Sequence, residues 1–203
     1  MLISLEQVSH EFLEGRALFQ PLSASFDRGE LIAITGPSGA GKSTLLAILA
    51  GLMPPTHGRI RRPGSPRACW VTQHPHGVAR RTALDHVCLP YLATGMRRRD
   101  AEPLARALLD RFGLSAVGDQ QFATLSGGQA QRLMIARSIA AAPDLLLLDE
   151  PTAQLDQRTA GEVDAALGAI ASTDLLVFVA THSAGTRAMC SRVVELEAPL
   201  GCG

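Results

Sequence analysis

A glycine-rich segment constrains this chain more than any other feature. Residues 36–44 read Gly-Pro-Ser-Gly-Ala-Gly-Lys-Ser-Thr and match the pattern G-x-x-x-x-G-K-[ST]. Glycines let backbone N–H groups turn toward phosphate oxygens, and a helix beginning after such a loop presents its positive dipole end to the same anion. An apolar run at 31–35 precedes the loop and a helical pattern at 42–50 follows it, so the sequence predicts a strand–loop–helix phosphate site. The candidate phosphate-binding residues are Gly36, Pro37, Ser38, Gly39, Ala40, Gly41, Lys42, Ser43 and Thr44.

A second chemical feature is a pair of acidic residues that follows four leucines. Residues 145–148 are all leucine and are followed directly by Asp149 and Glu150. Open α/β sheets bind ligands at the carboxyl ends of their strands, so these carboxylates are expected beside the phosphates. The pattern predicts that Asp149, together with the Ser43 hydroxyl, holds Mg²⁺ and that Glu150 orients or deprotonates an attacking water.

A second glycine-rich helix start occurs at residues 125–129, Leu-Ser-Gly-Gly-Gln. Ser126 is a good N-cap for the helical segment that follows, and this local explanation holds whatever else the segment does. The same helix start is also an anion site. Since one nucleotide does not need two such sites in one subunit, we expect each loop to complete a site on a second copy.

Composition limits the classes of function. The chain has 203 residues, of which 46% are apolar and 19% charged, which suits one soluble globular domain with a substantial core. The 19 basic residues balance 19 acidic ones, so the sequence lacks the basic surplus expected of a nucleic-acid-binding protein. The longest apolar runs are far shorter than the roughly 20 residues of a bilayer span, and no basic leader precedes residue 8, so a cytoplasmic protein is expected.

The hydrophobic pattern predicts an α/β fold with a parallel sheet, an antiparallel N-terminal β lobe and an inserted helical subdomain. The expected strands are 3–8, 22–26, 31–35, 58–62, 67–72, 145–148, 175–180 and 192–196, with 58–62 and 67–72 read as a pair joined by a Pro-Gly-Ser-Pro turn. Strand signals disappear between residues 82 and 142. We therefore expect a catalytic core with its β lobe at 1–74 and 143–203, and a helical subdomain at 75–142.

These three motifs, in this order and spacing, resemble the ATP-binding subunit of ABC transporters across essentially the whole chain. The resemblance implies a P-loop NTPase (RecA-like) core that binds ATP and Mg²⁺ and hydrolyses ATP. It implies a head-to-tail dimer with a second copy or a homologous ATPase subunit. It further implies separate transmembrane permease subunits, no nucleic-acid partner, and a cytoplasmic position, peripheral on the inner face of the cell membrane.

The resemblance also implies roles for single residues. Gln73 matches the Q-loop glutamine, which contacts Mg²⁺ and the water, and His182 matches the switch histidine near the γ-phosphate. Asp156 matches the D-loop aspartate that crosses the dimer, and Phe12 lies where an aromatic ring stacks on adenine. The implied catalytic residues are Glu150, His182, Gln73 and Lys42; the residues implied to contact nucleotide from the other subunit are Ser126, Gly127, Gly128 and Gln129.

A finer resemblance concerns residues 82–92, which are similar to the subfamily serving lipoprotein release, macrolide and peptide export, and cell division. His86 stands where that pattern usually has Asn. The alternative within the same family is an ATPase coupled to a membrane complex for signalling or mechanical work. A soluble ABC ATPase of DNA repair or translation is disfavoured, because the chain has one ATPase copy and no zinc-spaced cysteines. A small-molecule kinase would have no use for the second glycine-rich loop.

Overall fold

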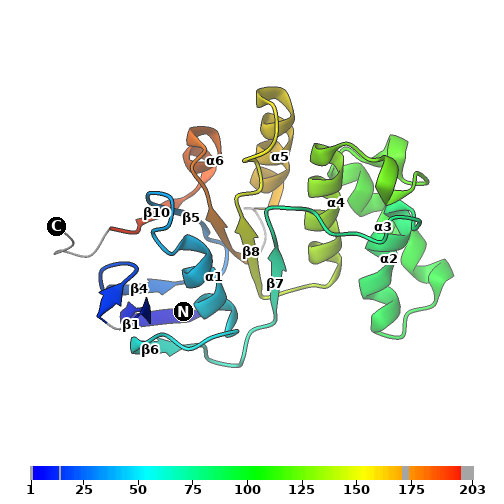
Figure 1. The fold of residues 1–203 in the computed structure, drawn as a ribbon. Coiled ribbons are helices and arrows are strands. Elements are labelled where there is room, and N and C mark those ends of the chain that lie inside the picture. The colour runs from blue at the N-terminus through cyan, green and yellow to red at the C-terminus, as the bar shows by residue number, and fades with distance from the viewer. Residues whose placement is uncertain (1, 14, 171–173, 198–203) are drawn as a thin grey trace.

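The fold is built on a five-stranded parallel sheet, seen in a computed structural model that describes residues 2–13, 15–170 and 174–197 (Figure 1). The strand order is β10-β5-β9-β8-β7, and every neighbouring pair is parallel. Consequently the loops that leave the carboxyl ends of these strands meet along one edge of the sheet. The strands are β5 (Leu31–Thr35), β7 (Ala68–Val71), β8 (Leu145–Asp149), β9 (Leu176–Ala180) and β10 (Arg192–Glu195).

A second, antiparallel sheet lies beside the first and has the order β4-β1-β6. It consists of β1 (Ile3–Ser9), β4 (Leu22–Phe26) and β6 (His57–Arg61). The strands expected at 58–62 and 67–72 therefore form, but pairing them was wrong: β6 pairs with β1, and β7 pairs with β8. The apolar β7 fits beside the four leucines of β8, whereas the mostly exposed β6 forms an edge of the antiparallel sheet. A further small hairpin, β2 (Glu11–Leu13) with β3 (Arg16–Ala17), was not expected.

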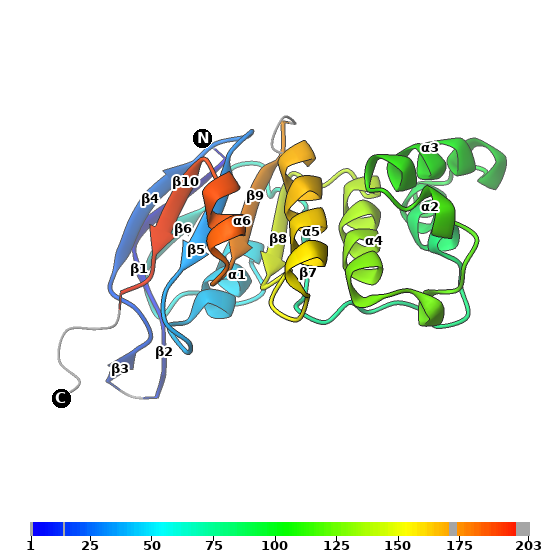
Figure 2. The ribbon, with the colours of Figure 1, turned by 90° about the horizontal axis from the view of Figure 1, so that it is seen from above.

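The two faces of the parallel sheet bury two different cores. Along β8, Leu145 and Leu147 belong to one core, with helix α1 (Lys42–Ala50) and the antiparallel sheet. Leu146 and Leu148 belong to the other, with helices on the opposite face. This alternation is the two-residue period of a strand, and burial on both faces explains the unbroken apolar sequence. Helix α1 thus lies between the two sheets, while α5 (Gln157–Ile170) and α6 (Ala184–Met189) cover the other face (Figure 2).

The remaining helices stand together at the end of the molecule away from the N-terminus (Figures 1 and 2). They are α2 (Ala83–Ala93), α3 (Arg98–Arg111) and α4 (Gly127–Ala140), with 3-10 turns at Ser115–Val117 and Phe122–Thr124. Helix α4 contacts α2 and α3 on one side and β7 and α5 on the other, so it joins this group to the sheet. Within the described parts of the chain, no helix is both long and apolar enough to cross a membrane.

Candidate active site

The loop after β5 has a backbone that only glycine accommodates at its two key positions. Gly36 and Gly41 have φ angles of 145° and 86°. A Cβ atom on Gly36 would lie 2.8 Å from the carbonyl oxygen of Leu196, and one on Gly41 would lie 3.0 Å from the Cβ of Leu18. Gly41 caps α1 without any side-chain hydrogen bond, so the first N–H groups of the helix are left for a ligand.

Lys42 is the chain's only lysine and is 8% exposed. Its Nζ donates to the carbonyl oxygens of Gly36 at 3.2 Å and Pro37 at 3.3 Å. The same atom lies 2.7 Å from Nε2 of His182 and 3.8 Å from Oε1 of Glu150. An ammonium group can only donate, so His182 accepts through an unprotonated Nε2 in this arrangement. The lysine therefore joins the phosphate loop to the ends of β8 and β9.

Glu150 follows β8 with a φ of 47°, in the left-handed region that a non-glycine residue rarely occupies. Its backbone N–H donates to the carbonyl oxygen of Ala180 at 2.9 Å. Its carboxylate accepts from the backbone N–H of His182 at 3.3 Å and lies 3.3 Å from Nε2 of the same ring. Residues held in such conformations cost on the order of 1–3 kcal/mol and cluster at functional sites. Here the strained turn directs the carboxylate toward Lys42.

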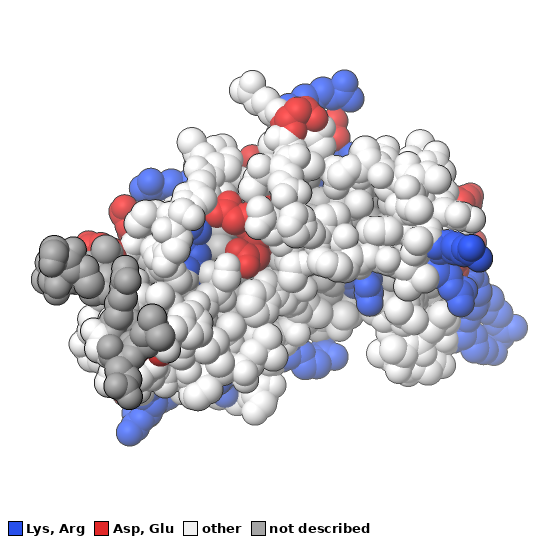
Figure 3. Space-filling model, viewed as in Figure 1, with Lys and Arg blue, Asp and Glu red and all other residues white. Residues whose placement is uncertain are grey.

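These groups line one cleft of about 840 Å³. In the view of Figure 3, acidic and basic atoms lie close together near the middle of the face. Phe12, on β2, is 64% exposed and lines the same cleft. The residues singled out in the sequence that line it are Phe12, Ser38, Gly39, Gly41, Lys42, Ser43, Thr44, Gln73, Asp149, Glu150 and His182. Gly36, Pro37 and Ala40 complete the loop itself, with the Ala40 N–H donating to the Pro37 carbonyl at 3.1 Å.

The cleft also contains oxygen donors of the kind that Mg²⁺ prefers. Ser43, Gln73 and Asp149 contribute a hydroxyl, an amide and a carboxylate to its lining. Among the described residues, no group of three or more His, Cys, Asp or Glu side chains could hold a metal by itself. Mg²⁺ is usually bound through one or two carboxylates together with substrate phosphates and waters, so this donor set fits Mg²⁺ arriving with a nucleotide.

The second glycine-rich helix start, at α4, lies outside this cleft. Ser126 and Gln129 form a capping box: the Gln129 N–H donates to Ser126 Oγ at 3.3 Å, and the Ser126 N–H donates to Gln129 Oε1 at 2.9 Å. Gly128 packs against α5, since a Cβ there would lie 1.9 Å from Cγ2 of Thr159. The glycine is therefore required for packing as well as for any anion contact.

Asp156 is also absent from the cleft lining. Its carboxylate accepts from the N–H of Thr159 at 3.0 Å and from the Thr159 hydroxyl at 2.7 Å, and these hydrogen bonds lower the pKa of Asp156. Of the residues singled out in the sequence, the structure thus gathers the loop, Gln73, the acidic pair, His182 and Phe12. Residues 126–129 and Asp156 do not line this cleft.

A buried polar network behind the cleft was missed in the sequence. Thr152, a cleft residue, lies with its Oγ1 3.4 Å from Oγ1 of Thr186, which donates to Oδ1 of Asp164 at 2.7 Å. Burial, with the charge of Asp164, raises the pKa of the neighbouring Cys190 thiol to about 11. The network ties the turn after β8 to helix α6, which follows His182. The available signal was Thr152 directly after the Asp-Glu-Pro run, but its partners lie far away in the sequence.

Comparison with known proteins shows which family has this sequence and fold. A sequence model of the ABC transporter family matches residues 19–153. The chain belongs to this family. It is 34% identical over 209 residues to the lipoprotein-releasing system ATP-binding protein LolD of Chromohalobacter salexigens, covering 95% of this chain and 88% of that protein. It is 41% identical over 190 residues to LolD of Cereibacter sphaeroides, covering 86% of this chain and 85% of that protein.

A solved structure shares the fold with a TM-score of 0.81 and 26% sequence identity, covering 96% of this chain and 94% of the other. It is a dimeric ATP-binding cassette in a post-hydrolysis state, bound to ADP and Pi. These findings confirm the expected fold class and the resemblance to ABC ATP-binding subunits, including the lipoprotein-release subfamily. The chain is an ATP-binding cassette with ATPase activity.

Proposed function

We propose that two copies of this chain, or one copy and a homologous ATPase subunit, bind two ATP molecules head to tail. Each ATP lies between residues 36–44 of one copy and residues 126–129 of the other. The observation that carries the proposal is the separation seen within one chain. Lys42, Glu150 and His182 line the cleft, whereas Ser126 and Asp156 do not. The dimeric form of the solved relative supports the same arrangement.

In this site the chain's own groups divide the work of phosphoryl transfer to water. The Lys42 ammonium leaves His182 Nε2 and contacts the β- and γ-phosphates, where it neutralises charge. Glu150 accepts a proton from the water while the oxygen of that water attacks the γ-phosphorus. The bond between the γ-phosphorus and the oxygen that bridges it to the β-phosphate breaks, and ADP leaves. His182 and Gln73 hold the water and the γ-phosphate in line. Ser43, Gln73 and Asp149 would hold Mg²⁺, which would add to the charge neutralisation at the phosphates.

The other implied contacts complete the nucleotide site. Phe12 stacks on adenine at the exposed rim of the cleft, as its 64% exposure permits. From the second copy, Ser126 and the N–H groups of Gly127 and Gly128 reach the γ-phosphate, with Gln129 bracing the capping box. Asp156 meets the facing copy across the dimer. ATP closes the dimer because its γ-phosphate touches both copies, and ADP lacks that bridge.

Closure is proposed to act on separate transmembrane permease subunits. A groove of about 630 Å³ runs between the end of β7 and helices α2 and α4, and apolar side chains such as Trp70, Leu89 and Met134 line it. Thr72, the neighbour of Gln73, lines the same groove, so the nucleotide cleft and the groove share one loop. This supports residues 75–142 as a helical subdomain that transmits movement from a core at 1–74 and 143–203.

The relatives support a transporter more than a membrane complex for signalling or mechanical work, because both are subunits of lipoprotein-releasing systems. We therefore assign the chain to a transporter of the lipoprotein-release and export type. The chain would lie on the cytoplasmic face of the cell membrane, held there by its permease, and the permease would recognise the cargo.

Glu150→Gln tests the proposal, because it removes the base while keeping the size of the side chain and one acceptor oxygen. Size-exclusion chromatography with light scattering, with ATP and Mg²⁺, should show twice the 21.5 kDa of the chain and almost no hydrolysis. Glu195→Gln, the same change on β10, should leave ATP turnover unchanged. A Glu150→Gln variant that binds ATP at saturation and stays monomeric would contradict the head-to-tail site.

A further inference from the structure

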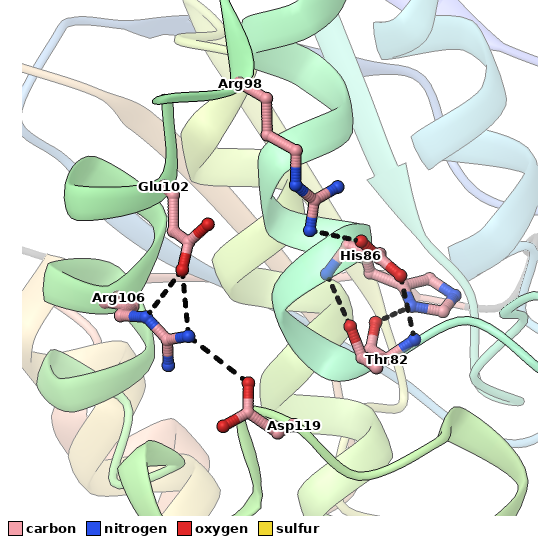
Figure 4. Close-up of polar contacts among 7 residues, drawn as sticks. Thr82, His86, Arg98, Glu102, Arg106 and Asp119 are labelled. Carbon is pink, nitrogen blue, oxygen red and sulfur yellow. Dashed lines mark hydrogen bonds and ion pairs between the residues drawn. The ribbon is translucent and has the colours of Figure 1, made fainter. Parts of the chain in front are cut away.

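His86 is a buried histidine whose two ring nitrogens are both engaged with the backbone. It lies on the first turn of α2 and is 3% exposed. Its Nδ1 lies 2.7 Å from the carbonyl oxygen of Thr82, and its Nε2 accepts from the backbone N–H of Val78 at 2.9 Å. Figure 4 shows the ring beside Thr82 at the start of the helix.

These two contacts define the protonation state of the ring. A carbonyl oxygen can only accept, so Nδ1 carries a hydrogen. A backbone N–H can only donate, so Nε2 carries none. The ring is therefore neutral, in the Nδ1–H form. A second proton, on Nε2, would point at the N–H of Val78 and remove that hydrogen bond.

The surroundings keep the ring in place and give protons access to it. The Phe122 ring lies 5.2 Å from the imidazole, centroid to centroid. A surface cavity of about 330 Å³ is lined by His86 together with Arg81 from the preceding loop, Asp85 from α2 and Arg98 from α3. Asp85 and Arg98 form an ion pair at 2.8 Å, so the charged groups facing the ring are one paired acid and two bases.

The segment held by His86 is the loop that carries Gln73. At the beginning of this loop, Nε2 of Gln131 on α4 donates to the carbonyl oxygen of Thr72 at 3.4 Å, and Gln131 is 2% exposed. At its other end, the N–H of Val78 donates to His86. Gln73 lies between these two anchors and lines the nucleotide cleft.

We propose that His86 is a positioning residue for Gln73. The neutral ring holds the loop between the nucleotide cleft and the helical subdomain, and protonation of the ring releases it. ATP hydrolysis, and its coupling to the groove beside α2, would then weaken once the ring carries a second proton. The inference rests on the proposed role of Gln73, while the state of the ring itself can be measured without any ATPase assay.

The first test reads the ring directly. Long-range ¹H–¹⁵N NMR of the imidazoles in the full chain should show the His86 ring in the Nδ1–H form at pH 7.5, in addition to that of His182, and His86→Gln should remove the signal of His86 alone. Trp70, the only tryptophan, lies two residues before Thr72 and should change its fluorescence together with the NMR signal of that ring when the ring is protonated. The exposed His74 offers a matched control, since His74→Gln should leave both signals in place. A ring at position 86 in the Nε2–H form would overturn the proposal.

The second test is the pH profile of ATP turnover at saturating ATP. A glutamine at position 86 presents a carboxamide oxygen to the Val78 N–H and does not titrate near neutrality. Because one buried hydrogen bond is worth about a tenfold change in an equilibrium, the wild type should lose about tenfold more kcat than His86→Gln between pH 8 and pH 6. KM for ATP should not move. Superimposable profiles would overturn the proposal. A wild type without ATPase activity would instead contradict the proposed function, and the NMR result would stand separately.

Discussion

The molecule contains two glycine-rich helix starts, and they leave their backbone N–H groups in different states. At α1, Gly41 provides no side-chain cap, and the helix opens into the cleft. At α4, Ser126 and Gln129 cap the helix themselves, and Gly128 is pressed against Thr159. Similar composition therefore has two causes: at α1 the glycines leave donors for a ligand, and at α4 they also permit close packing of α5. Within one chain, only the start of α1 faces the cleft; the start of α4 does not line it.

The largest effect should come from the ligand side of this comparison. Lys42→Ala removes the cation that faces the phosphates, so ATP turnover should fall about 100- to 1,000-fold, as for the loss of one preorganised charge donor. Lys42→Arg keeps the charge but not the point geometry, and it should recover only part of the rate. Steady-state phosphate release measures both variants. If turnover of Lys42→Ala stayed within threefold of wild type, the backbone N–H groups at the start of α1 would be sufficient for the site without the lysine side chain.

The close packing of Gly128 against α5 should appear as a difference in the free energy of unfolding. A Cβ at position 128 would lie 1.9 Å from Cγ2 of Thr159, whereas one at 127 would lie 3.5 Å from Leu155. Gly128→Ala should therefore lower the free energy of unfolding by about 1–3 kcal/mol more than Gly127→Ala, because an overpacked contact forces its neighbours to move. Chemical denaturation compares the pair. Adding Thr159→Ser removes the clashing methyl and should restore much of the loss; without such restoration, the packing explanation of Gly128 fails.

Comparing the two capping boxes separates the capping role of Ser126 from its proposed contact with nucleotide. Thr82 caps α2 as Ser126 caps α4, each with a partner three residues later. Alanine at either position should cost about 1 kcal/mol of stability. Only Ser126→Ala should also reduce ATP turnover, several-fold, because its hydroxyl is proposed to meet the nucleotide of the other copy. Equal turnover in the two variants would mean that Ser126 acts only as a cap.

The smallest effect concerns Asp156 at the start of α5. Hydrogen bonds from Thr159 lower its pKa below the ordinary 3.8, so they contribute stability above that value, and this contribution is lost as the pH falls through the lowered pKa. Thr159→Val removes the hydroxyl donor. Urea denaturation at pH 5, 4 and 3 should show a stability deficit relative to wild type that is the same at pH 5 and pH 4 and begins to shrink at pH 3. A deficit that stays constant with pH would exclude a charge-dependent contact.

Much of the core could be predicted because its signals are local. Helix α1 begins and ends as expected, since glycines bound it on both sides, and β8 and β9 were recognised as unbroken apolar runs. The hairpin β2–β3 was missed because its strands are only three and two residues long. The turn between β6 and β7 gave no sign that the strands separate into two sheets, since that depends on which distant strand each meets.

The candidate site likewise has parts that could be predicted from local sequence and parts that could not. Continuous motifs, such as residues 36–44 and 145–150, could be read directly, because the residues that act together are neighbours in the sequence. The network of Thr152, Thr186 and Asp164 could not, because its members meet only after β9 and α6 are placed. The anion site at residues 126–129 was inferred from its glycine-rich helix start, whereas Asp156 was identified through the family resemblance. The place of both in a site depends on a second copy.

The single lysine has a practical consequence for regulation and for assay. Lys42 is the only lysine of the chain, so a reagent or enzyme that acylates lysine side chains can modify this residue type only inside the phosphate loop. In the proposed site, bound nucleotide shields that amine, and acylation of the amine removes the charge that the phosphates require. The proposed site therefore makes lysine acylation and nucleotide binding exclude each other, and the protection of Lys42 by added nucleotide should report occupancy of the cleft.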